Sequence, residues 1–187
     1  MKVVIIGHSF VRRLRELVEK DSDCANLRLE TDKFQVNFRA RGGLTVHKLR
    51  QQAELLSFNH TDLVFLQIGG NDLSTLSPYQ VAHSIFDIVE HILNVNRARH
   101  VVVGQLFWRS PEATKSDLYN DKVVRTNLLL SEGAQCSRRI TFWRHRGFWK
   151  KTLSFLSVDG VHLHVQAQRK YLQSVKAAIL TVAKTID

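Results

Sequence analysis

Cysteine and proline are scarce in this chain, with two residues of each among 187, and long apolar runs are absent. Cys24 and Cys136 lack the spacing of metal ligands, so we expect reduced structural cysteines; a disulfide would require that a leader has been removed. No apolar run approaches the roughly 18 residues that a membrane-spanning helix needs. Neither a low-complexity linker nor an internal repeat is visible, which favours a single domain over residues 1–187.

A secretory signal is also lacking near the N-terminus. Lys2 is followed by only four large apolar residues before Gly7 interrupts the run. A signal peptide needs a longer apolar segment and a small-residue cleavage site. The sequence therefore predicts an intracellular protein, in the cytoplasm or the nucleus.

Acidic residues are too few to balance the basic ones: 17 Asp and Glu stand against 27 Lys and Arg, a net charge of +10. Such a charge favours contact with polyanions, namely nucleic acid, an anionic membrane surface or phosphorylated substrates. The alternative is a solvated basic surface that only keeps the protein soluble. Charge alone does not separate these interpretations.

The apolar residues that are present form five short runs, each followed by a helical pattern. Runs rich in Val, Ile, Leu and Phe are typical of strands buried on both faces of a parallel sheet. Strict alternation of strands and helices predicts a three-layer α/β/α sandwich with a five-stranded parallel sheet. The expected strands are 2–6, 34–40, 61–68, 99–106 and 139–143, and the expected helices are 10–20, 45–57, 78–95, 117–134 and 166–184.

Residues suited to chemistry follow the expected strands, where open parallel sheets bind their ligands. Ser9 follows the first strand at a strand-to-helix turn, and its N–H would point from a helix N-terminus that favours an oxyanion. Gly43 follows the second strand and Asn71 the third, so each could supply a further oxyanion donor. The structural alternatives are an N-cap serine, a turn glycine and a turn asparagine.

One histidine among the nine has a carboxylate at a useful offset. Asp159 lies three residues before His162, so one turn can place the carboxylate against one ring nitrogen and leave the other free as a base. A base so oriented activates a serine hydroxyl. A metal pair of His162 and His164 has no evident third ligand, so we expect no metal.

These residues together resemble those of the SGNH, or GDSL-type, hydrolases, which are named for Ser, Gly, Asn and His in four sequence blocks. The match is carried by Ser9, Gly43, the Gly-Asn-Asp of residues 70–72 and Asp159-x-x-His162, in the family's order and over nearly the whole chain. The resemblance implies a flavodoxin-like fold and ester hydrolysis through an acyl-enzyme. In that mechanism Ser9 attacks, His162 is the base, Asp159 orients it, and Ser9, Gly43 and Asn71 bind the oxyanion, without a cofactor.

One position departs from the family's pattern. His8 stands where the first block usually has aspartate before the serine. That aspartate is not the acid of the triad, so the departure puts the rate in doubt rather than the fold. The chain also looks similar to the SGNH-like esterase domains found in open reading frames of some non-LTR retrotransposons.

A basic and aromatic segment, residues 138–151, leads toward Asp159 and His162. Its mixture of Arg, Lys, Phe and Trp suits phosphate contact with base stacking, although the apolar residues could equally be core. Beside the cleft we expect His8, Arg41, Trp108 and Arg109 to contact substrate, with a preference for negatively charged esters.

The sequence thus predicts a serine esterase that acts on small-molecule or lipid esters. The absence of a long insertion that could form a lid favours short acyl groups. The alternative is a weakly active or inactive SGNH scaffold whose basic face binds nucleic acid or lipid. The sequence does not predict the oligomeric state.

Overall fold

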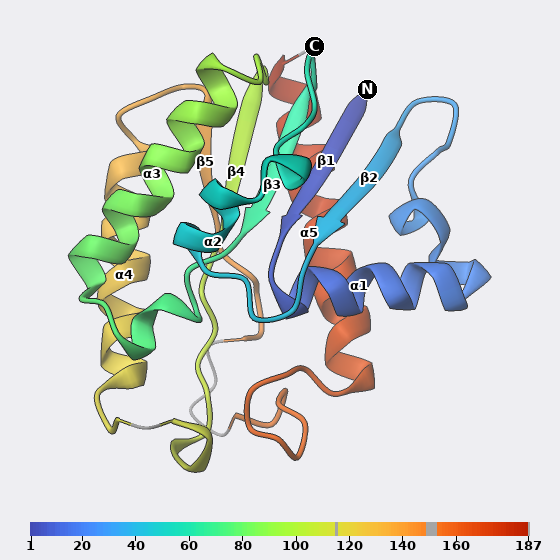
Figure 1. Ribbon diagram of the computed structural model, residues 1–187. Helices are drawn as coiled ribbons and strands as arrows, with labels where there is room; N and C mark the ends of the chain where they lie inside the picture. The colour runs from blue at the N-terminus through green and yellow to red at the C-terminus, as the bar shows by residue number, and fades with distance from the viewer. Residues whose placement is uncertain (115, 149–152, 187) are drawn as a thin grey trace.

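Five parallel strands form the centre of the molecule in a computed structural model (Figure 1), which describes residues 1–114, 116–148 and 153–186. The strand order is β2-β1-β3-β4-β5, and every adjacent pair is parallel. The predicted five-stranded parallel sheet is therefore confirmed. The strands are β1 (Lys2–Gly7), β2 (Gln35–Ala40), β3 (Leu63–Gln67), β4 (His100–Gly104) and β5 (Ile140–Trp143).

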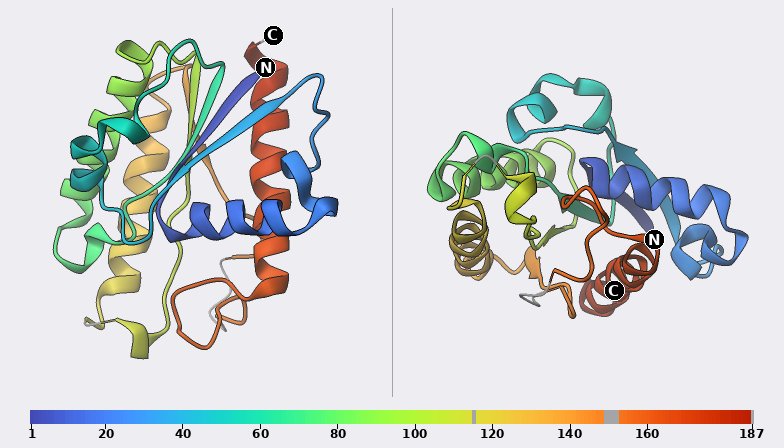
Figure 2. Two further views of the ribbon diagram at one scale, coloured as in Figure 1. Left: turned by 45° about the vertical axis from the view of Figure 1, so that its right-hand side comes forward. Right: turned by 90° about the horizontal axis from the view of Figure 1, so that it is seen from below.

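Helices cover both faces of this sheet, as the two views of Figure 2 show, with α1 and α5 on one face and α2, α3 and α4 on the other. One core lies on each side, because alternate residues of the buried strands point to opposite faces. The three-layer sandwich is thus confirmed. The helices are α1 (Ser9–Lys20), α2 (Val46–Gln51), α3 (Pro78–Asn94), α4 (Tyr119–Ala134) and α5 (Val165–Ile186).

The predicted helix over 45–57 is wrong in its second half. Helix α2 ends at Gln51, and Ala53–Leu55 form a separate 3-10 turn. Short 3-10 segments also occur at Ser22–Arg28, Asp72–Ser74 and Pro111–Ala113, none of which was predicted. Such segments follow tertiary packing rather than a long apolar period, so the sequence pattern does not reveal them.

The connections that follow the adjacent strands β1 and β3 run toward opposite edges of the sheet. After β1 the chain crosses to β2 on one side, and after β2 it returns past β1 to β3. After β3 the chain continues to β4 on the other side, so the loops after the adjacent strands β1 and β3 flank a switch point, where ligands of such sheets bind. Within the described part of the chain, no helix is long and apolar enough to cross a membrane.

Candidate active site

Ser9 is the first residue of α1, directly after β1 turns into the helix. Gly7 permits this turn, because a Cβ there would lie 2.3 Å from the Gln67 carbonyl oxygen. That carbonyl accepts the His8 N–H at 3.2 Å, and the His8 ring caps α1 by accepting the Phe10 N–H at 3.4 Å. Because His8 provides the cap, the Ser9 side chain is left free for other partners.

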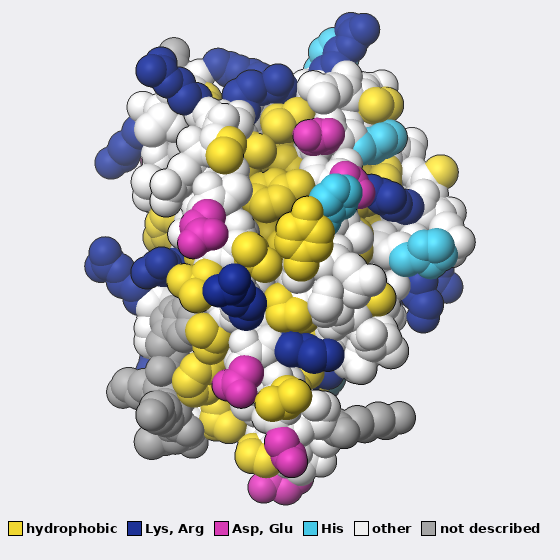
Figure 3. Space-filling model, turned by 90° about the vertical axis from the view of Figure 1, so that its left-hand side faces the viewer, with side chains coloured by type: hydrophobic (Ala, Val, Ile, Leu, Met, Phe, Trp, Pro, Cys, Tyr) yellow, Lys and Arg dark blue, Asp and Glu magenta, His cyan; other side chains and the backbone are white. Residues whose placement is uncertain are grey.

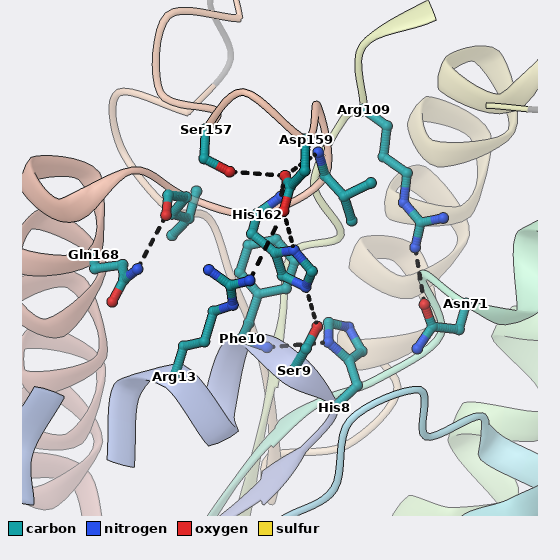
Figure 4. Close-up of polar contacts among 12 residues, drawn as sticks. His8, Ser9, Phe10, Arg13, Asn71, Arg109, Ser157, Asp159, His162 and Gln168 are labelled. Atoms are coloured by element: carbon teal, nitrogen blue, oxygen red, sulfur yellow. Dashed lines mark hydrogen bonds and ion pairs between the residues drawn. The ribbon is translucent and has the colours of Figure 1, made fainter. Parts of the chain in front are cut away.

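His162 faces Ser9 from the loop that precedes α5 (Figure 4). Its Nε2 lies 2.9 Å from Ser9 Oγ, and its Nδ1 lies 2.7 Å from Asp159 Oδ2. A carboxylate can only accept, so Nδ1 carries the proton and the Nε2 lone pair faces the serine hydroxyl. The three side chains predicted as a triad are thus brought together in one hydrogen-bonded chain.

Asp159 is held by its own loop. Its Oδ1 accepts the N–H groups of Val161 and His162, at 2.9 and 2.8 Å, and the Ser157 hydroxyl at 2.7 Å. Burial raises the pKa of Asp159, but these bonds and the His162 ring together hold it far below its usual range. Arg13 adds a positive charge 3.8 Å from Oδ2. The carboxylate therefore stays ionised beside His162.

Asn71 lies on the other side of the site, in the loop after β3. Its Nδ2 donates to the Leu44 carbonyl at 3.0 Å, and its Oδ1 accepts from Arg109 at 2.9 Å. These opposite partners fix the orientation of the amide. Because an amide nitrogen has two protons, one N–H of Asn71 remains for an oxyanion.

Arg109 supports Asn71 rather than projecting freely into the cleft, as Figure 4 shows. The guanidinium also donates to the Gly70 carbonyl at 3.2 Å and lies 4.7 Å above the ring of Tyr119. Tyr119 donates its hydroxyl to the same carbonyl at 2.9 Å. The Asn120 side chain bonds the backbone of Arg109 twice, because its Oδ1 accepts the N–H and its Nδ2 donates to the carbonyl.

Gly43 lies in an exposed turn after β2. Its φ of +68° favours glycine, and a Cβ there would meet no atom within 4 Å, so the space beside it is open.

The segment that follows this turn is anchored by Asp72, whose carboxylate accepts the Val46 N–H at 3.0 and 3.2 Å. Burial raises the pKa of Asp72 to about 6, although these hydrogen bonds oppose the shift.

A narrow recess lies beside these residues, between His8 and Phe10 on one side and Gly70 and Arg109 on the other. Its volume of about 10 Å³ is close to what one water molecule needs. Of the four predicted substrate contacts, three line it, whereas Arg41 is exposed on the turn after β2 and is not among the lining residues that the structure describes. The lining consists of His8, Phe10, Gly70, Leu106, Phe107, Trp108, Arg109, Tyr119 and Val161.

His8 is buried in this wall, only 4% exposed. Burial first, and then the electrostatic effects of Arg109 and of the His162 ring, lower the pKa of His8 to about 3. His8 is therefore a neutral wall of the recess near neutral pH. Its role as helix cap and wall was not predicted from its position beside Ser9.

Several supporting residues had no usable signal in the sequence. Tyr119 and Asn120 begin a helix, and nothing in their spacing points to the loop after β3. Asp72 adjoins Asn71, so the sequence indicated that it lies near the site. Nothing in the sequence indicated that its carboxylate accepts the Val46 N–H. His164, by contrast, uses both ring nitrogens locally, on the Ser154 carbonyl and the Ala167 N–H, rather than joining His162.

The basic and aromatic segment divides into distinct parts. Phe148 is only 2% exposed and belongs to the core, and Phe142 and Trp143 pack against opposite cores. Arg139 donates to the carbonyls of Arg99, Leu93 and Ala98. Trp149, Lys150 and Lys151 lie outside the described residues.

Solved structures with this fold were found, and three of them share 14–17% sequence identity with this chain. Neither the protein-family models nor the curated proteins gave a match. A GDSL-like lipase from Bacteroides thetaiotaomicron is 16% identical, with 97% of this chain and 88% of that chain covered and a TM-score of 0.70. A member of the lipolytic protein G-D-S-L family from Veillonella parvula is 17% identical, with coverages of 96% and 98% and a TM-score of 0.70.

An acetylxylan esterase from Geobacillus stearothermophilus, solved as a catalytic mutant, gives a similar result. It is 14% identical, covers 95% of this chain and 93% of that chain, and has a TM-score of 0.68. At these identities the likeness is one of fold. The chain therefore has the fold of the SGNH, or GDSL-type, hydrolases.

Proposed function

We propose that the protein is a serine ester hydrolase that works through an acyl-enzyme. The observation that carries the proposal is the chain of contacts from Ser9 Oγ to His162 Nε2, at 2.9 Å, and from His162 Nδ1 to Asp159, at 2.7 Å. Both distances lie within hydrogen-bond range, as a nucleophile, a base and an orienting group require. The proposal treats residues 1–187 as one domain.

In the first half of the reaction, Ser9 Oγ attacks the ester carbonyl carbon and passes its proton to His162 Nε2. The tetrahedral intermediate collapses, the bond to the alcohol oxygen breaks, and the alcohol leaves with that proton. In the second half, water attacks the acyl-enzyme while Nε2 takes a proton from it. Ser9 leaves with the proton returned, and the carboxylic acid is released.

The oxyanion of each intermediate needs donors on the side opposite the base. The N–H of Ser9 lies at the start of α1, where the first N–H groups have no acceptor within the helix and the dipole favours negative charge. The second N–H of Asn71 and the N–H of Gly43 complete the proposed set. Arg109 and Leu44 hold the Asn71 amide, so little reorganisation is needed during the reaction.

The recess beside the site favours a small acyl group. At about 10 Å³ it has room for a group of about the size of a methyl, and it is walled by rings and by buried His8. The methyl of an acetyl ester would fill this recess, whereas a long acyl chain would have to lie outside it. The acetylxylan esterase of the same fold acts on acetyl esters, which is in keeping with this substrate class.

Hydrolysis of p-nitrophenyl acetate tests the proposal. Ser9→Ala removes the nucleophile and should lower kcat/KM by about 10⁴-fold or more, to near the background rate. Ser84→Ala, in α3 and remote from these contacts, is the matched control and should keep the wild-type rate. Equal background rates for wild type and Ser9→Ala would reject the esterase and favour the scaffold that only binds.

A further inference from the structure

Strand β5 lies at the edge of the sheet, and one of its sides has no neighbouring strand. The carbonyls of Arg139 and Trp143 bond to Val101 and Gln105 next to β4, so the alternate residues face away from β4. Phe142 is central among these. Within the described part of the chain, neither its N–H nor its carbonyl has a partner on the open side.

The open side of β5 forms the floor of a trench between α4 and α5. A hollow of about 330 Å³ lies on the α4 side, and one of about 1020 Å³ lies on the α5 side, with Phe142 and Arg144 lining both. The first is completed by Val124, Asn127 and Leu128, and the second by Ser131, Trp143, Arg146, Lys170, Gln173, Ser174, Ala177 and Thr181.

The two walls differ in chemistry. Val124 and Leu128 are 36% and 44% exposed, so the α4 wall offers apolar surface. This wall belongs to the face shown in Figure 3, where hydrophobic side chains gather over α3 and α4 and Lys and Arg lie among and beside them. The α5 wall carries Arg146 and Lys170, and no acidic residue occurs among the described lining of either hollow.

We propose that this trench, defined by β5 with its α4 and α5 walls, binds an extended segment of a partner protein as an added strand. The partner's main chain would pair with Phe142, as peptides do when they extend a sheet edge. Since side chains alternate along a strand, one set would face Val124 and Leu128 and the other Arg146 and Lys170. The segment is therefore one in which apolar and acidic residues alternate.

Charge excludes a second copy of this chain as the natural occupant. Antiparallel pairing of β5 with β5 about Phe142 would place Arg146 of one molecule opposite Arg138 of the other, and each molecule already carries a net charge of +10. Like charges directly opposite on paired strands are destabilising. An acidic segment instead neutralises the basic wall.

Nucleic acid fits the trench less well than a peptide. The rings of Phe142 and Trp143 pack on the two cores, and Trp143 donates its Nε1–H to Ser174 at 3.1 Å. Neither ring is therefore placed as a platform for a base. Exposed Val124 and Leu128 would lie against phosphates, whereas an unpaired strand edge is complementary to a peptide backbone.

Fluorescence anisotropy with a labelled eight-residue peptide of alternating Glu and Val tests the proposal. The expected result is saturable binding, which is lost for alternating Lys and Val and weakened for a peptide with the same residues in two blocks. Arg146→Glu should weaken binding about five- to tenfold, because it replaces attraction by repulsion. Arg125→Glu, an exposed residue of α4 outside the lining, is the matched control and should change binding less than twofold.

Hydrogen exchange separates strand addition from mere charge attraction. Peptide binding should slow exchange of the Phe142 amide, and Leu128→Asp should weaken binding about tenfold while the melting temperature stays within a few degrees. Equal binding of both acidic peptides without protection of Phe142 would overturn the proposal. So would tighter binding of a dT12 oligonucleotide through Arg146, a wild-type dimer that Leu128→Asp disrupts, or no binding at all.

Discussion

The two halves of the site are built in different ways. The nucleophile half, Ser9 with Asp159 and His162, depends on a carboxylate and a ring only three residues apart on one turn. The oxyanion half, around Asn71, is held by Leu44 and Arg109, which come from loops after two other strands. Apart from Ser9, the residues of the nucleophile half are close together in the sequence. Those of the oxyanion half are far apart in the sequence and meet only in the folded chain.

This difference implies different responses to mutation. In the proposed mechanism, each group of the nucleophile half has a chemical role that a neighbour cannot take over. In the oxyanion half, three proposed donors would share one task, and Arg109 would only hold one of them, Asn71. We therefore expect substitutions in the nucleophile half to lower the rate of hydrolysis more than substitutions in the oxyanion half.

Asp159→Asn should give the larger loss of activity of the two halves of the site. The amide can donate to Nδ1 and so stabilise the wrong tautomer, with the proton on Nε2 facing Ser9. We expect kcat for p-nitrophenyl acetate to fall about 10³- to 10⁴-fold with little change in KM. Circular dichroism should show the native fold. A loss under tenfold would mean that the carboxylate is not needed to orient His162.

The contacts of Ser9 and Asp159 with His162 could be predicted because their signals in the sequence are short-range. An Asp-x-x-His offset fits one turn, and Ser9 directly follows an apolar strand. The fold was equally accessible, since buried parallel strands are continuous apolar runs that alternate with helices. The five predicted strands lie within a few residues of the observed ones, because each is bounded by polar or glycine residues.

The supports of the oxyanion half could not be predicted, because they join residues far apart in the chain. Tyr119 and Gly70 are 49 residues apart, and Val46 and Asp72 are 26 apart. Arg109 was expected to meet substrate, since a lone arginine after a strand gives no sign of an internal partner. Only the folded loops show that Asn71 is that partner.

Asn71→Ala should give the second largest effect. Loss of one oxyanion donor costs about 10²- to 10³-fold in turnover, with KM nearly unchanged. Arg109→Gln keeps the Asn71 donor but loosens its orientation, so we expect a smaller loss, about tenfold. Stopped-flow or steady-state hydrolysis of p-nitrophenyl acetate measures both. A larger loss for Arg109→Gln than for Asn71→Ala would show that Arg109 acts on substrate directly and does more than hold Asn71.

Acid should destabilise the fold through buried histidines before it neutralises Asp159. The pKa of buried His8 is lowered to about 3, as is that of His145, while the pKa of Asp159 lies well below its usual range. An unfolded histidine binds a proton below about pH 6.5, whereas native His8 does so only near pH 3. The free energy of unfolding therefore falls as the pH falls through this window, by about 1.4 kcal/mol per pH unit for each such group.

His8→Asn tests this expectation, since Asn can also cap α1 but does not titrate. Urea unfolding between pH 6 and pH 4 should show a slope against pH that is smaller than that of wild type by about one proton. His145 continues to contribute in the variant, so a slope remains. Ser84→Ala, a change in α3 that removes no titratable group, is the control and should leave the slope unchanged. If His8→Asn also leaves it unchanged, His8 is protonated in the native site, and a cation then adjoins the oxyanion half.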